Sequence, residues 1–202
     1  MAGHFESAGG PDGGAAIVLD ATEISILRSL ATQLLELIGP EPGGPEPADP
    51  LDALFAEGPT EPPADPALAR LFPDAYGQPG AAADEESRRL SAEFRRFTES
   101  ELRARKREDL LALVRDLDSV ASEARAAGEE GAVLTLKPEE SRRWLGGLND
   151  LRLAIGARLG LKDDEGTEAL LDLPDDAPEK PVAIAFLWLG SLQESLIGTM
   201  AP

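Results

Sequence analysis

The sequence contains no cysteine and only one histidine, His4. Without thiols, this chain has no disulfides, thiolate metal sites, cysteine nucleophiles or thiol redox switches of its own. A histidine base, a histidine-bound metal or a Ser-His-Asp triad would depend on His4 alone. His4 lies beside glycine-rich sequence, so we expect a surface residue. No phosphate-binding, dinucleotide, nucleophile-elbow or calcium-loop motif is present either. The sequence therefore predicts a non-catalytic protein without metal or cofactor.

Positive charge is also scarce, since 19 basic residues face 38 acidic ones and the net charge is −19. Such a charge repels nucleic-acid phosphates and anionic membranes, so direct binding to either is not expected. The start of the chain lacks the basic and apolar regions of a signal peptide. The longest strongly apolar run, residues 181–190, is too short to span a bilayer. We therefore expect a cytoplasmic protein that binds no membrane.

Apolar residues at helical spacing predict helices over residues 21–38, 66–72, 84–127, 138–159 and 182–199. Asp20 and Glu23 form a capping-box pattern for the first of them. Residues 84–127 are either one long helix with an exposed middle or two helices with a bend near residues 101–106. The last helix is apolar on most sides, which is typical of a central helix in a bundle.

Short strands are predicted around Phe5, over residues 15–19 and over residues 133–136. The expected fold class is mainly α: a helical bundle with a small accessory antiparallel β element, formed by an N-terminal hairpin and one later short strand. Nine of the 17 prolines lie in residues 39–66, which predicts a flexible loop there. With an acidic loop over 161–180, the sequence predicts a single helical domain over residues 1–202.

One segment of this acidic chain carries a net positive charge. Residues 88–115, here called the basic segment, hold nine basic and five acidic residues, a net charge of +4, whereas the rest of the chain carries −23. One interpretation is a solvated helix face with ion pairs such as Glu99–Arg103 and Glu101–Arg105. The other is a contact surface for a partner protein. The candidate partner-binding residues are Arg95, Arg96, Arg103, Arg105, Lys106 and Arg107, together with Phe55 in the proline-rich loop.

Polar residues also interrupt two strongly apolar predicted helices. They are Asn149, Asp150, Arg152, Gln193 and Glu194. Because buried polar groups need partners, we expect a structural network in which Arg152 pairs with Glu194 or Asp150. The alternative is an acid–base pair in a pocket, which would indicate an enzyme.

Three blocks, DPALARLFPDAY, ESRRWLGGLNDLRLAIGARLG and FLWLGSLQESL, follow an N-terminal hairpin and the helix LDATEISILRSLATQLLELI. In this order they resemble the actinobacterial family of AosR-type oxidative-stress transcriptional regulators. The resemblance implies a cytoplasmic regulator that acts with RNA polymerase carrying an alternative sigma factor, on genes of cysteine and redox metabolism. A disulfide trigger cannot reside in this chain. The alternative is an adaptor or scaffold in proteolysis or sulfur metabolism, and an apolar helix face would also permit a homodimer.

Overall fold

The computed structural model describes residues 3–9, 13–40, 58–77, 84–161 and 164–200, without the side chains of 164 and 165. Its helices are α1 (Ala21–Ile38), α3 (Pro66–Leu71), α4 (Glu85–Ala127), α5 (Pro138–Arg158), α6 (Asp164–Ala169) and α7 (Lys180–Met200). Its strands are β1 (Glu6–Ser7), β2 (Ala15–Asp20) and β3 (Gly131–Leu136). The predicted mainly α fold with a small β element is confirmed.

The three strands form one antiparallel sheet in the order β1-β2-β3. Side chains alternate between its two faces, so Ala15, Ile17 and Leu19 are buried whereas Val18 is 62% exposed. Gly14 precedes β2 with φ of 126°, and a Cβ there would lie 2.3 Å from the carbonyl oxygen of Leu136. Only glycine therefore allows the hairpin to approach β3 this closely.

Helix α1 begins at the predicted capping box. The Asp20 carboxylate accepts a hydrogen bond from the Glu23 amide at 2.8 Å, and the Glu23 carboxylate accepts one from the Asp20 amide at 2.9 Å. These two bonds satisfy backbone donors that a helix start leaves unpaired. They also fix the point at which β2 turns into α1.

We expect Asp20→Ala to lower the free energy of unfolding by about 1 kcal/mol, because it removes the capping acceptor. Chemical denaturation monitored by circular dichroism measures the change. Glu36→Ala, on the exposed side of the same helix, is the matched control and should change stability by less than about 0.5 kcal/mol. Equal losses for the two variants would show that the cap contributes nothing.

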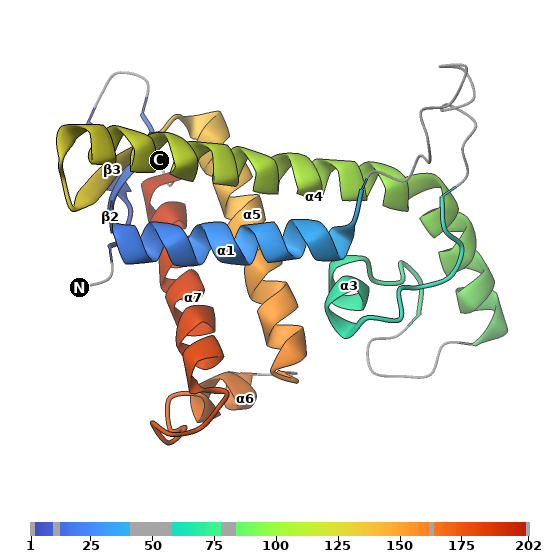
Figure 1. Ribbon diagram of the computed structural model, residues 1–202. Coiled ribbons are helices and arrows are strands. Elements are labelled where there is room, and N and C mark those ends of the chain that lie inside the picture. Colours follow the sequence, from blue (N-terminus) through green and yellow to red (C-terminus); the bar gives the residue numbers. More distant parts are fainter. Residues whose placement is uncertain (1–2, 10–12, 41–57, 78–83, 162–163, 201–202) are drawn as a thin grey trace, which may run out of the picture.

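The core lies where α1, α4 and α5 meet the sheet and α7 (Figure 1). Trp144 of α5 is 1% exposed and meets Phe5 edge-on, with ring centroids 6.1 Å apart. Its indole nitrogen donates a hydrogen bond to Asp116 of α4 at 2.7 Å, so its one polar atom is satisfied. The Phe5 amide donates to Ser195 Oγ of α7 at 3.1 Å, which joins segments 190 residues apart.

The structure resolves the alternatives for residues 84–127 in favour of one helix. Helix α4 is continuous for 43 residues, and Figure 1 shows its first turns (green) running at an angle to the remainder, which lies along α1. Its polar middle is not exposed all round, because Arg95 and Glu99 are buried.

Two details of the sequence prediction were wrong. The short helix α6 occupies part of the acidic segment 161–180 that we predicted as a loop. Its six residues include Gly166 and several charges, so the apolar spacing typical of a helix is missing. Helix α7 is not a central helix, since it packs on α5 and the sheet with one side while Ile184 and Ile197 remain 55% and 53% exposed.

By length and composition alone, α7 is also the one helix among the described residues that could cross a membrane. Its best 18-residue window has a mean hydropathy of 1.3, and 33% of that window is buried in the fold. Leu189, Leu192 and Leu196 of α7 are fully buried in the core. The helix therefore contributes to the core with one side and presents an apolar surface with the other.

Candidate functional site

The basic segment lies along α4, and the structure divides its side chains between the interior and the surface. The buried leucines Leu110, Leu113 and Leu117 form the inner stripe of α4. Counting backwards from Leu110 in steps of three or four residues reaches Lys106 or Arg107, Arg103, Glu99 and Arg95. Much of the basic segment therefore continues the inner stripe and faces other parts of the chain rather than solvent.

Arg95, Glu99 and Arg103 form a buried ion cluster. Arg95 and Glu99 are 4% and 3% exposed and pair directly, and the other Glu99 oxygen accepts a hydrogen bond from Arg103 Nε at 2.8 Å. This confirms the expected Glu99–Arg103 pair. Charges so deeply buried are tolerated only when they are paired and hydrogen-bonded. The cluster is therefore part of the protein's internal structure.

The ion cluster also holds the segment that follows α3. Arg95 donates to the Phe72 carbonyl at 3.0 Å and to the Asp74 carboxylate at 2.8 Å, and the Arg103 guanidinium lies 4.3 Å from the centre of the Phe72 ring. Burial alone lowers the pKa of Arg95, but its hydrogen bonds to Asp74 and Glu99 and their negative charges raise it above its ordinary value. Arg95 therefore keeps its charge in the interior.

Arg103 and Arg107 close the end of α1. Arg103 donates to the Ile38 carbonyl at 3.0 Å, and Arg107 donates to the carbonyls of Leu35, at 3.3 Å, and of Gly39. Helix α1 has no basic residue in its own last turn. The two arginines of α4 therefore supply the positive charge that the negative end of the α1 dipole attracts, and they satisfy carbonyls that the helix end leaves open.

Lys106 pairs with Asp150 of α5 at 2.6 Å, and these side chains are 15% and 4% exposed. Burial raises the pKa of Asp150, although the hydrogen bond and charge of Lys106 oppose the shift. Burial is also the main cause of the raised pKa of Asp109, one turn beyond Lys106. We expected Arg152 to pair with Glu194 or Asp150, but Asp150 faces α4 and pairs with Lys106 instead.

The other predicted network residues do not join Asp150. Arg152 lies 4.9 Å from the centre of the Phe186 ring and against Gly190 of α7, whereas Asn149 and Glu194 are exposed and Gln193 is buried. Arg152, Gln193 and Glu194 line an open groove of about 530 Å³ on α5 and α7. Asp150 is not among the lining residues. The groove therefore brings Arg152 and Glu194 together but leaves out Asp150.

Of the candidate partner-binding residues, Arg105 is exposed and Arg96 is half-buried. The Arg96 guanidinium lies 5.4 Å from the centre of the Phe97 ring. Phe55 lies outside the described residues. Arg95, Arg103, Lys106 and Arg107 bind other parts of the chain, so their side chains are committed to the fold in this structure.

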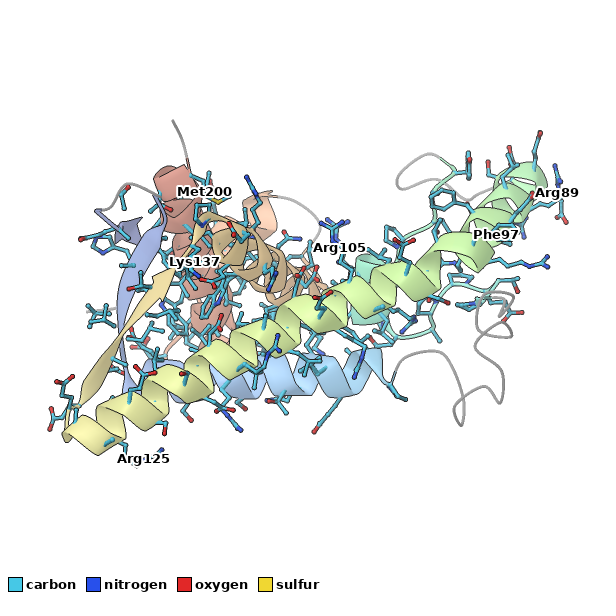
Figure 2. All side chains as sticks on the ribbon, turned by 90° about the horizontal axis from the view of Figure 1, so that it is seen from above. Arg89, Phe97, Arg105, Arg125, Lys137 and Met200 are labelled. Atoms are coloured by element: carbon cyan, nitrogen blue, oxygen red, sulfur yellow. The ribbon has the colours of Figure 1, made fainter. Side chains whose placement is uncertain are left out.

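The structure adds exposed aromatic residues that our sequence reasoning missed. We define the aromatic arm as the first turns of α4 that carry Arg88, Arg89, Phe94 and Phe97. Figure 2 shows Arg89 and Phe97 at the end of α4 that extends beyond the other helices. Phe97 is 69% exposed and Phe94 is 47% exposed, with its ring edge-on to Tyr76 at 6.2 Å. The sequence signal was present, since both phenylalanines fall outside the inner stripe of α4.

Among the described residues, no three His, Asp or Glu side chains are close enough together to hold a metal ion. His4 is exposed and lies 3.2 Å from the Glu6 carboxylate. The arrangement offers two kinds of chemistry: buried ion pairs that join helices, and exposed aromatic and basic side chains that a protein surface could contact.

A family model described as a domain of unknown function, DUF2017, matches residues 2–200. The protein named oxidative stress regulator AosR of Mycobacterium tuberculosis H37Rv is 29% identical over 183 residues, covering 87% of this chain and 77% of its own length. The same values hold for the Mycobacterium bovis protein of that name. A Mycobacterium leprae relative is 30% identical over 190 residues. No solved structure is significantly similar. The match over nearly the whole length shows that this chain belongs to the DUF2017 family.

Proposed function

We propose that this chain is a non-catalytic regulatory protein of the oxidative stress response that acts by binding a protein of the transcription machinery. The aromatic arm carries the proposal, because it combines two exposed phenylalanines with arginines on a chain whose net charge is −19. Contact surfaces of proteins are enriched in aromatic residues and arginine. The names of the mycobacterial relatives support a regulatory role.

The proposed partner is RNA polymerase or a sigma factor. The exposed phenylalanines and arginines of the arm favour a partly apolar surface with acidic side chains on that partner. The remaining acidic surface of the chain opposes direct contact with promoter DNA. The side chains of Arg95, Arg103 and Arg107 support the arm by holding α4 against α1 and the segment after α3.

We expect Phe97→Ala to weaken partner binding at least about tenfold, because an exposed aromatic anchor is lost while nothing in the core changes. Affinity purification of the intact chain from an actinobacterial lysate, followed by mass spectrometry, identifies the partner. Surface plasmon resonance with that purified partner then measures the loss. Val133→Ala, at an exposed position of β3, is the matched control and should bind like the original chain.

A pull-down that recovers no polymerase subunit or sigma factor, but enriches a protease adaptor or an enzyme of sulfur metabolism, would support the adaptor alternative. Unchanged affinity of Phe97→Ala for the polymerase would contradict the role of the aromatic arm. Arg89→Glu tests the electrostatic part independently, because reversing an exposed charge should slow association and weaken the salt dependence of binding.

A further inference from the structure

The outer face of α7 has the spacing of a helix that contacts another helix. Its positions 184, 187, 191, 194 and 198 follow one another at intervals of three and four residues, as Ile, Leu, Ser, Glu and Gly. This spacing places side chains in one seam along a helix. Ile184 is 55% exposed, and Ile197 beside the seam is 53% exposed. Helix α7 packs on α5, β1 and β2, while four of the five seam positions are exposed.

Three polar atoms without partners belong to α5 and α7. Arg152 Nε, Trp188 Nε1 and Gln193 Oε1 are shielded from solvent and form no hydrogen bond within the described residues. Gln193 as a whole is 8% exposed. Buried polar groups are nearly always satisfied in native proteins, so three such atoms on one pair of helices require an explanation. A partner that covers the seam and reorders these side chains would supply it.

The groove beside the seam contains one positive and one negative side chain. Arg152 and Glu194 both line the open groove of about 530 Å³, and in the described part of the chain neither of them takes part in an ion pair. The groove therefore has no net charge, although the chain carries −19. Two copies of such an acidic chain repel each other least when they associate through surfaces that carry no net charge.

We infer that two copies of this chain associate through the outer face of α7, with the helices antiparallel and Glu194 of each copy facing Arg152 of the other. A twofold interface requires a self-complementary surface, in which residue i meets residue j and residue j meets residue i. One cation and one anion in the same groove meet this requirement. Antiparallel helices crossing near Ser191 keep the two Glu194 carboxylates apart, whereas a parallel pair would place them together.

The test is sedimentation velocity of the purified full chain between about 1 and 100 µM, with Ile184→Glu and Glu194→Arg as disrupting variants. We expect the original chain to form dimers at the higher concentrations. Each variant should raise the dimer dissociation constant at least about tenfold, because it places a charge in the apolar seam or sets two arginines against each other. The double variant Arg152→Glu/Glu194→Arg should restore dimers, since the exchanged charges again attract.

Phe97→Glu on the aromatic arm is the matched control, and it should leave the dimer intact while it abolishes binding to the proposed partner. Thermal unfolding of each variant shows whether the fold is retained, which we expect for the substitutions at the exposed positions 97, 184 and 194. A chain that stays monomeric up to 100 µM overturns the inference. So does a dimer that neither single variant weakens, or flotation of the monomer with lipid vesicles through α7. None of these results bears on the aromatic arm.

Discussion

Replacing Glu99 by alanine should lower the free energy of unfolding by about 3 kcal/mol. The carboxylate is 3% exposed and is the direct partner of both Arg95 and Arg103. Its removal leaves a buried guanidinium without its nearest counter-charge, and breaking one side of a buried ion pair typically costs 3–5 kcal/mol. Arg95 retains Asp74 and the Phe72 carbonyl, so we expect the lower end of this range. Chemical denaturation at neutral pH measures the loss.

Glu101→Ala is the matched control, because Glu101 is an exposed glutamate half a turn farther along α4. It should change stability by less than about 0.5 kcal/mol. The double variant Arg95→Met/Glu99→Leu should recover part of the loss, since it removes the uncompensated charge and keeps apolar volume in its place. A loss of under about 1 kcal/mol for Glu99→Ala would show that the cluster is hydrated in solution.

Replacing Lys106 by methionine should also cost about 3 kcal/mol near neutral pH, because Asp150 would then be a buried carboxylate without its cation. The loss should depend on pH. Burial already raises the pKa of Asp150 in the folded protein above its ordinary value. Asp150 therefore lowers the free energy of unfolding as the pH rises from its pKa in the unfolded chain through its pKa in the folded protein. Without Lys106 the folded pKa rises further, and the unfavourable window extends to higher pH.

The difference in unfolding free energy between the original chain and Lys106→Met should therefore shrink as the solution is acidified, because protonated Asp150 no longer needs a counter-charge. Urea denaturation at a series of pH values measures this difference. Arg142→Met removes one exposed positive charge from α5 and should show a small loss that varies little with pH. A pH-independent loss for Lys106→Met would indicate that packing, and not the charge of Asp150, explains it.

The elements that the sequence predicted well are those with local signals. The capping box at Asp20 and Glu23 and the regular leucines of α1 depend on residues three or four apart, and the observed bounds of α1 agree with the prediction. The turn-rich sequence between β1 and β2 likewise marks the hairpin. These local patterns predict structure reliably because the contacts they describe form within one segment of the chain and do not depend on its tertiary packing.

The sequence did not readily predict whether the side chains of the basic segment face the interior or the solvent. A run such as RARKR has the composition of a solvated helix face, yet Arg103 and Arg107 bind backbone carbonyls of α1, and a backbone carbonyl has no signature in the sequence. The sequence did contain one indication of this direction, because helical spacing from Leu110 back to Arg95 places these side chains on the inner stripe of α4. Helix α7 posed the opposite difficulty, because a helix that is apolar all round does not reveal which side meets the core.

The contact between Phe5 and Ser195 has a consequence for the way the protein is made. The edge strand β1 pairs with the nearby β2, but the amide and the ring of the preceding Phe5 find their partners on α7 and α5. On the ribosome, a growing polypeptide therefore cannot complete the contacts of Phe5 until α7 has emerged. Interrupted translation before α7 would release a chain with an open apolar sheet, which is the kind of species that chaperones and proteases recognise.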